Sequence, residues 1–516
     1  MTEDRPPIGL AKLPSLQILA IYGCAAVLLV TLLLNLLRYS SNAYLSVIYP
    51  GEIDYGEGIV WQQAALLPGP QAYGDLQQFP FLVFHYPPVF HLLANAVSAL
   101  GIGWLAAGRL VSLVATTAVA MLLGAIVLEM SARDANRPGQ SASAWFGAIV
   151  AGLLVFSFTP IVFWSRVARV DMLAAVWELG GFYLALRALR RPGLLPIAAL
   201  CFVLAVYTKQ TMITGALAAF LVMLTIARWP AIRAALLALL VGGIVAITLH
   251  LVTDGGFFRH IIAYNVNPFS LTAAFIWIVR LGPQHFHPAF PAVALASAVA
   301  LAIRMAGSVG HRLRPAGAMV LLYTGFATAI LVTMGKSGSG SNYFIPVTCA
   351  QIILIGAAVT QLARLSPASW RMALGFGGLC LVLAAQTLLV PKYGERALVD
   401  AELHRQTDAI IARIRASPQP VLSEDMVLNM RAGKIIPWEP IIITDLSSKG
   451  LFEERKILDI IANGGLGFVV LNSTSSEKPI CGLRFSDLVC AALIKAFPVV
   501  RPMGTGPLRL LLPTGS

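Results

Sequence analysis

Long apolar runs, separated by short polar segments, fill the chain from residue 16 to residue 390. Many of these runs reach roughly 17 to 24 residues, which as a helix is enough to cross the hydrocarbon layer of a bilayer. The composition agrees, because 58% of the 516 residues are hydrophobic and only 12% are charged, whereas a soluble domain carries about 25% charged residues. We therefore expect an all-α polytopic membrane domain of about 11 to 13 transmembrane helices. The expected spans are residues 16–37, 107–130, 143–163, 172–187, 195–208, 212–227, 234–252, 288–304, 316–334, 344–363 and 372–390, and two further crossings could lie within 253–287.

Arginines in the short loops predict the orientation of these spans. The apolar stretch Val89–Ile102 has 14 residues, which suits an interfacial or re-entrant segment better than a full span. If this stretch does not cross, every loop on the side of the N-terminus is basic, as the positive-inside rule requires of cytoplasmic loops. We therefore expect a bacterial inner-membrane protein with a cytoplasmic N-terminus and a periplasmic C-terminus. The basic loops carry Arg133, Arg137, Arg187, Arg190, Arg191, Arg228, Arg233, Arg304, Arg312, Arg314, Arg364 and Arg371.

The chain becomes more polar from about residue 391. Helical patterns at 397–417, 452–462 and 485–497 alternate with strand patterns at 421–425, 441–445, 468–472 and 508–513, which is typical of a small α/β domain. We therefore divide the chain into a transmembrane domain, 1–390, with outer loops 38–106 and 253–287, and a soluble periplasmic domain, 391–516. In an oxidising compartment Cys481 and Cys490 could form a disulfide; two free thiols are the alternative.

An acidic segment follows the first span. Glu52, Asp54 and Glu57 lie within the glycine-rich stretch Gly51–Gly58. A general base takes the proton of an attacking hydroxyl, and a carboxylate suits this task when burial raises its pKa. A solvated acidic loop is the alternative interpretation.

Several cations fall on the predicted outer side, against the insertion bias, and therefore suggest an anion-binding role. Arg166, Arg169 and Asp171 lie where one span ends and the next begins, and arginine binds phosphate through paired hydrogen bonds. Lys209 lies at another outer boundary, and Lys336 lies in the glycine- and serine-rich segment 335–343. A structural Arg–Asp pair, lysines that extend from buried positions toward the membrane surface, and a flexible hairpin are the corresponding alternatives.

Together these motifs resemble the GT-C superfamily of integral-membrane glycosyltransferases, in particular the branch of protein O-mannosyltransferases and lipid A aminoarabinose transferases. The resemblance covers residues 15–390. It departs from the lipid A enzymes at the acidic motif, Asp-Tyr-Gly-Glu-Gly, and at His85-Tyr86-Pro87-Pro88, where those enzymes have Lys-Pro-Pro. The matching positions are Asp54 with Glu57, Tyr86-Pro87-Pro88, Arg166 and Arg169 with Asp171, Lys209, and Asn342-Tyr343.

The resemblance implies an inverting transfer of a sugar from a polyprenyl phosphate to a hydroxyl acceptor, which could be a lipid, a polysaccharide or a protein. It implies that Asp54 acts as the base or orients the acceptor and that Asp171 assists it; Glu57 is the alternative base. The donor phosphate is expected to contact Arg166, Arg169, Lys209 and Lys336, and the substrates to contact Tyr55, His85, Tyr86, Asn342 and Tyr343. No cofactor is expected to be required, and a divalent metal is disfavoured although the carboxylates could supply oxygen ligands.

Two other classes of protein are alternatives. A lipid or sugar transporter or flippase would carry charges in the middle of its spans, whereas these spans are nearly free of charge. A non-catalytic scaffold would leave the acidic segment and the outer cations unexplained. Nucleic acid is not an expected partner despite the net charge of +13, because no basic stripe or aromatic-rich motif accompanies this charge. The expected partners are the bilayer, the lipid-linked donor and the acceptor.

Overall fold

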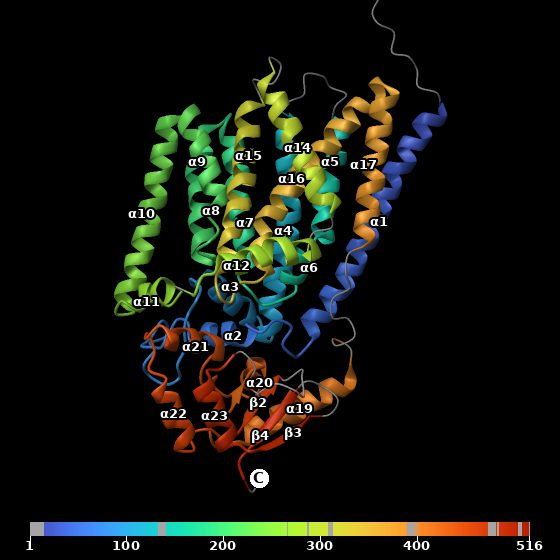
Figure 1. The fold of residues 1–516 in the computed structure, drawn as a ribbon. Coiled ribbons are helices and arrows are strands. Elements are labelled where there is room, and N and C mark those ends of the chain that lie inside the picture. The colour runs from blue at the N-terminus through green and yellow to red at the C-terminus, as the bar shows by residue number, and fades with distance from the viewer. Residues whose placement is uncertain are drawn as a thin grey trace, which may run out of the picture.

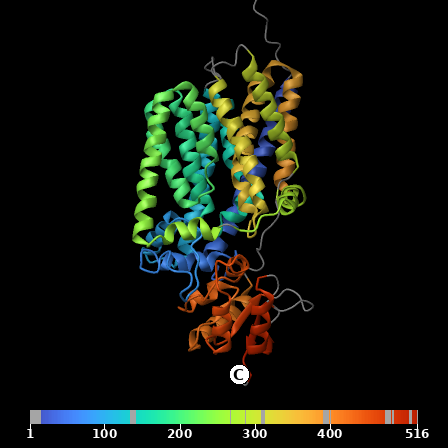
Figure 2. The same cartoon turned by 60° about the vertical axis from the view of Figure 1, so that its left-hand side comes forward.

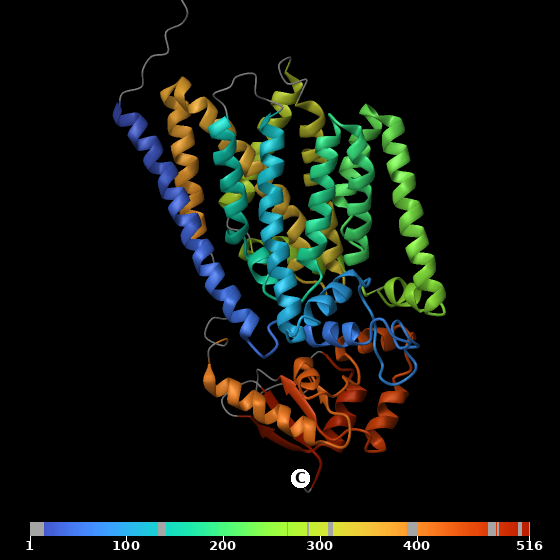
Figure 3. The ribbon, with the colours of Figure 1, turned by 180° about the vertical axis from the view of Figure 1, so that it is seen from behind.

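The computed structural model describes residues 15–132, 141–265, 267–285, 288–307, 313–389, 398, 400–472, 481, 484–503 and 508–514. It consists of a helical bundle with a smaller mixed α/β part packed against one end (Figure 1). We call this end of the bundle the site end. Helix α1 begins at the opposite end, and the connections between α7 and α8, between α9 and α10 and between α16 and α17 lie there too (Figures 1 and 3).

Each of the eleven predicted spans coincides with a helix or with a helix and its short extension. Seven helices in the described part of the chain are long and apolar enough to cross a membrane, so the chain is an integral membrane protein. The helices of the bundle are α1 (Ser15–Ile48), α4 (Trp104–Ala132), α5 (Ser141–Leu154) with α6 (Thr159–Trp164), α7 (Asp171–Ala188), α8 (Leu195–Thr208), α9 (Thr214–Ile226), α10 (Arg228–Val252), α14 (Ala289–Ala306), α15 (Arg314–Ala329), α16 (Ile345–Leu365) and α17 (Trp370–Leu388).

Small residues allow the central helices to pack closely. A Cβ atom on Gly147 of α5 would lie 1.9 Å from the hydroxyl oxygen of Thr360 on α16. The side chain of Thr360 therefore packs directly against the backbone of α5. Close approach at small residues is the usual way in which membrane helices associate, because lipid chains are as apolar as leucine. By contrast, the most apolar stretch of α10 buries none of its residues, as expected for a helix at the edge of the bundle (Figure 2).

Short elements cover the site end. Helix α2 (Glu57–Ala65) and helix α3 (Val89–Ser98) follow α1, and α3 confirms that the apolar stretch after Pro88 is too short to span. Between α10 and α14 lie α11 (Gly256–Ile261), α12 (Leu271–Phe275), the π-helical turn Ile276–Leu281 and α13 (Gly282–His285). None of these described elements is long enough to cross a bilayer, so the two additional crossings that we allowed within 253–287 are absent from the described residues.

The C-terminal part contains a four-stranded sheet of order β1-β2-β4-β3, in which only β1 and β2 run parallel. Cys481 and Cys490 are joined by a disulfide, with 5.7 Å between their Cα atoms. The elements are α19 (Ala401–Ala416), β1 (Leu422–Ser423), α20 (Met426–Arg431), α21 (Pro440–Ser448), α22 (Arg455–Ala462), β2 (Val469–Asn472), α23 (Asp487–Ala496), β3 (Val499–Pro502) and β4 (Leu508–Leu512).

One prediction for this part was wrong, and two elements, α20 and β3, were not predicted. The run 441–445 is helix α21 and not a strand, because Glu439 accepts hydrogen bonds from the backbone N–H groups of Ile441 (3.2 Å) and Ile442 (2.6 Å) and Pro440 occupies the first turn. These are the usual signals of a helix N-terminus, and they outweigh the strand preference of three consecutive isoleucines. Strand β3 was not predicted at all; its alternating pattern is weak, since three of its four residues are exposed.

The segment between α2 and α3 packs into the C-terminal part. Leu76, Phe81 and Val83 lie in one hydrophobic cluster with Trp438 and Leu446, and the backbone N–H of Phe81 donates to the carbonyl of Pro437 at 2.9 Å. The two parts of the chain therefore share a core at the site end of the bundle.

Candidate functional site

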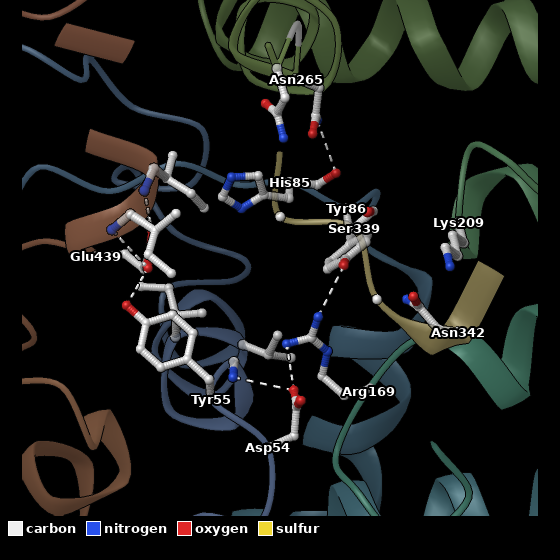
Figure 4. Close-up of a pocket in the computed structure, with 18 of the residues that line it drawn as sticks. Asp54, Tyr55, His85, Tyr86, Arg169, Lys209, Asn265, Ser339, Asn342 and Glu439 are labelled. Carbon is white, nitrogen blue, oxygen red and sulfur yellow. Dashed lines mark hydrogen bonds and ion pairs between the residues drawn. The ribbon is translucent and has the colours of Figure 1, made fainter. Parts of the chain in front are cut away.

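A cavity of about 340 Å³ lies between the site end of the bundle and helix α21 (Figure 4). Residues from seven parts of the sequence line it: 54–63, 85–86, 164–169, 209–211, 265–267, 337–343 and 439–445. Eight of the twelve predicted site residues line the cavity, and four do not. The eight are Asp54, Tyr55, His85, Tyr86, Arg169, Lys209, Asn342 and Tyr343.

Asp54 and Arg169 form an ion pair in the wall of the cavity, with 3.0 Å between Oδ2 and Nη1. The same carboxylate oxygen accepts a hydrogen bond from the backbone N–H of Gly56 at 3.2 Å. The arginine also donates to the hydroxyl of Tyr86 at 3.2 Å. A Cβ atom on Gly56 would lie 1.5 Å from Arg169 Nη1, so only glycine at position 56 lets the guanidinium reach the carboxylate.

The environment of Asp54 suits a base. Burial raises the pKa of the Asp54 carboxyl, and the guanidinium of Arg169 opposes part of this rise. Desolvation of this kind disfavours the charged form of a carboxyl group. A proton from a bound hydroxyl is therefore better accepted here than by an exposed aspartate.

A second ion pair lies next to the first. Lys209 Nζ is 2.6 Å from Asp171 Oδ1, and the Nδ2 of Asn342 donates to the same oxygen at 2.9 Å. The ammonium also lies 5.0 Å from the centre of the Tyr343 ring. Asp171 is fully buried and is not among the lining residues; its contacts hold Lys209 and Asn342, which do line the cavity.

The other three predicted residues that do not line the cavity lie behind or beside it. Glu57 is 0% exposed and pairs with Arg109 at 2.7 Å. Arg166 is buried, and its Nε donates to the carbonyl of Val162 at 3.0 Å. Lys336 is half-buried and pairs through its backbone with Phe269, while the residues that follow it, from 337 to 340, line the cavity.

The C-terminal part supplies the opposite wall, through Glu439, Ile441, Ile442 and Asp445. The hydroxyl of Tyr55 donates to Glu439 Oε1 in a short hydrogen bond, and Asp445 Oδ2 accepts from the hydroxyl of Ser337 at 2.8 Å. Sequence reasoning missed this wall. The sequence Trp-Glu-Pro before an apolar run is a helix-start signal that could have placed Glu439 at an N-cap, but nothing local connects it to the acidic loop.

Further polar residues of the cavity lining were also missed, among them Gln63, Gln210, Thr211, Asn265 and Asn267. Gln210 and Thr211 directly follow Lys209, so their position beside a predicted residue was the available signal. Asn265 and Asn267 lie in the loop after α11 and had none. The side-chain amides of Gln210 and Asn265 donate to the carbonyl of His85, at 3.0 and 3.2 Å, and so fix the segment that carries His85 and Tyr86.

Two of the carboxylates at this site are already paired with cations. Asp54 faces Arg169 and Asp171 faces Lys209, so a divalent cation would bring further positive charge against two groups that are already neutralised. Among the described residues, no three His, Cys, Asp or Glu side chains lie close enough together to hold a metal ion.

Comparisons with known proteins identify the fold. No family model matches the chain, and no curated protein matches its sequence. Among solved structures, the lipid A aminoarabinose transferase ArnT from Cupriavidus metallidurans bound to undecaprenyl phosphate is similar, with a TM-score of 0.56 and 14% identity over 93% of this chain and 97% of ArnT. The archaeal oligosaccharyltransferase AglB from Archaeoglobus fulgidus, in complex with an inhibitory peptide and a dolichol-phosphate, has a TM-score of 0.55 and 12% identity over 87% of this chain and 69% of AglB. Over nearly its whole length, the chain therefore has the fold of the GT-C membrane glycosyltransferases.

Proposed function

We propose that this protein is an inverting glycosyltransferase that moves a sugar from a polyprenyl phosphate to a hydroxyl acceptor. The observation that carries the proposal is the partly buried pair of Asp54 and Arg169 in one cavity wall, with Lys209 beside it. A carboxylate and two cations within one cavity match the needs of a hydroxyl acceptor and a phosphate leaving group. The similarity of the fold to ArnT and AglB, whose structures hold undecaprenyl phosphate and dolichol-phosphate, supports a lipid-linked donor.

In the proposed reaction, the acceptor hydroxyl gives its proton to Asp54 while its oxygen attacks C1 of the sugar. The bond between C1 and the phosphate oxygen breaks, and the electron pair leaves with the polyprenyl phosphate. Arg169 and Lys209 stabilise the negative charge that develops on this leaving group. The products are the glycosylated acceptor, the free polyprenyl phosphate and a protonated Asp54, which returns its proton to water.

We place the cavity on the periplasmic side of a bacterial inner membrane. The support is the positive-inside rule, because the arginine-bearing connections α7–α8, α9–α10 and α16–α17 lie at the end of the bundle away from the cavity. The disulfide between Cys481 and Cys490 is compatible with this placement, since an oxidising compartment favours such bonds. In this proposal residues 1–390 form the transferase domain and residues 391–516 a periplasmic domain.

The test is a native mass spectrum of the purified protein, followed by a transfer assay in lipid nanodiscs. We expect a co-purified polyprenyl phosphate, and transfer from undecaprenyl phosphate esters of several sugars to a hydroxyl acceptor in an envelope extract. Wild type that binds the carrier and moves it between leaflets, but transfers no sugar from any ester of the panel, would favour a flippase. Wild type that binds neither the carrier nor its sugar esters would contradict the proposal.

A further inference from the structure

Arg109 of helix α4 makes five hydrogen bonds although it lies outside the cavity. Its guanidinium binds both oxygens of Glu57, at 2.8 Å and 2.7 Å. Its Nη1 also donates to the carbonyls of Ser46 (2.8 Å) and Tyr49 (2.6 Å), and its Nη2 donates to that of Gly51 (2.7 Å). Arg109 and Glu57 are both 0% exposed. The arginine therefore ties the end of α1 and the acidic loop to one point on α4.

Glu57 connects this point to a second loop. Its Oε2 accepts from the backbone N–H of Ile53 at 2.7 Å, within the acidic loop. Its Oε1 accepts from the backbone N–H of Ala168 at 2.7 Å, in the loop between α6 and α7. One carboxylate thus holds two loops that are more than a hundred residues apart in sequence.

Ser112, one helical turn after Arg109, binds the second loop from the same side. Its hydroxyl donates to the carbonyl of Val167 at 2.7 Å and lies 3.2 Å from that of Arg169. The backbone of this loop passes so close to α4 that a Cβ atom on Gly108 would lie 2.8 Å from the Cβ atom of Ala168. One face of α4 therefore supports the loop from 167 to 169.

The two cavity residues of the proposed reaction are placed by these contacts. Asp54 precedes Glu57 by three residues, and Arg169 directly follows Ala168. We propose that Arg109, acting through Glu57 and together with Ser112, is the positioning residue that sets Asp54 against Arg169. The inference rests on the proposed function for its catalytic meaning and gives Glu57, which the sequence suggested as a catalytic residue, a positioning role instead.

The first test uses Ser112→Ala, because loss of one hydroxyl is compatible with folding, with Thr116→Val as its control. Thr116 is also buried, but its hydroxyl donates within its own helix to the carbonyl of Ser112 at 2.8 Å. We expect Ser112→Ala to weaken binding of undecaprenyl phosphate by about 2- to 10-fold, as for a lost neutral hydrogen bond. The control is expected to bind the carrier as wild type does, and both variants to keep a wild-type melting temperature within a few degrees.

The pH profile of transfer separates positioning from simple destabilisation. Arg169 lowers the pKa of Asp54, while Glu57 and Asp171 raise it. A displaced guanidinium therefore raises the pKa of Asp54, and the acid limb of transfer shifts to higher pH in Ser112→Ala but not in Thr116→Val. Unchanged carrier affinity together with an unchanged acid limb in Ser112→Ala would overturn the inference.

Hydrogen exchange tests the coupling of the loops without any substrate. We expect Arg109→Lys to accelerate amide exchange in peptides 49–58 and 165–172 together, because one pair holds both loops, and Thr116→Val to accelerate neither. Acceleration in only one peptide would overturn the inference, even if the wild type transfers sugar. Joint acceleration in a protein that binds no carrier would leave the positioning role intact and contradict the proposed function alone. If Arg109→Lys does not fold, Glu57→Gln serves for the same measurement.

Discussion

The two walls of the cavity are built differently. The membrane-side wall holds its charges as pairs, Asp54 with Arg169 and Lys209 with Asp171, so a ligand that competes for one partner frees the other. The C-terminal wall holds its carboxylates in structural bonds, because Glu439 caps α21 and Asp445 accepts from Ser337. The difference suggests that the chemistry belongs to the membrane-side wall, and that the C-terminal wall closes the cavity and shapes what enters it.

The largest expected effect comes from the membrane-side wall. We expect Asp54→Asn to lower the rate of transfer by about 10²- to 10⁴-fold, the usual contribution of a general base, and to leave the affinity for undecaprenyl phosphate within about threefold. The control is Asp408→Asn, at an exposed carboxylate of α19 that pairs with Arg431. Single-turnover transfer at saturating donor is the measurement, and wild-type rates in Asp54→Asn would remove the base from the proposed mechanism.

The next effect separates two arginines of one loop. We expect Arg169→Ala to weaken undecaprenyl phosphate binding by about 10- to 150-fold, as for a lost charged hydrogen bond. Arg166→Ala is the matched control, because Arg166 is buried away from the cavity; it should lower the melting temperature by several degrees and change carrier affinity little. Equal losses of affinity in the two variants would mean that the loop as a whole, and not Arg169, binds the phosphate.

A change of pH examines the same wall. Burial raises the pKa of Asp54, and a base is active only when it is deprotonated. The rate of transfer should therefore fall as the pH drops. This fall should begin at a pH above the one at which an exposed aspartate becomes protonated. Arg169→Gln removes the cation that lowers this pKa, and should therefore move the acid limb of transfer further up. The measurement is the transfer rate as a function of pH at saturating donor. If the acid limb shifted to lower pH in Arg169→Gln, a group other than Asp54 would be responsible for it.

The opposite wall should give a smaller effect on transfer. We expect Glu439→Ala to destabilise the protein by about 1 kcal/mol, as for a lost N-cap, to slow transfer by less than about tenfold, and to leave affinity for the bare carrier unchanged. Glu454→Ala is the control, since Glu454 stands at the N-cap of α22 without a capping hydrogen bond. Thermal melting and transfer rates measure the two consequences. A loss of carrier affinity in Glu439→Ala would mean that both walls bind the donor phosphate.

The smallest effect is expected at Lys336, which does not line the cavity. Lys336→Ala should change carrier affinity by less than about twofold, as most surface substitutions do. Lys209→Ala, at the lysine that does line it, is the comparison, with an expected loss like that of Arg169→Ala. A large loss in Lys336→Ala would show that this side chain turns toward the donor in the bound state.

The bundle and the membrane-side wall were largely predictable from the sequence. Spans are set by local hydropathy, and charges at the ends of spans stand out against it, which is how the acidic segment, Arg169 and Lys209 were found. The choice of Asp54 within that segment came from the resemblance to the GT-C enzymes. Proximity in the sequence could not distinguish the residues that face the cavity from the residues that hold them in position. Asp54 and Glu57 lie three residues apart, yet only contacts with distant Arg109 and Ala168 decide that Glu57 faces away.

The C-terminal wall was not predictable in the same way. Its contacts join residues far apart in the chain, such as Tyr55 with Glu439, and they depend on how the C-terminal part packs against the bundle. The one local signal, the helix start at Trp438-Glu439-Pro440, was missed, because the three isoleucines that follow favour a strand. Short polar loop residues such as Asn265 carry no periodicity and gave no signal.

The shared core of Leu76, Phe81 and Val83 with Trp438 has a consequence for synthesis. The side-chain amide of Gln62 donates to the carbonyl of Ile436, which lies 374 residues later in the chain. At a translation rate of about 5 to 20 residues per second, Ile436 is synthesised about 20 to 75 s after Gln62. During that time the acidic loop has emerged from the ribosome but its second wall does not exist. A chain that ends before Ile436 therefore lacks both the second wall of the cavity and the partners of this shared core.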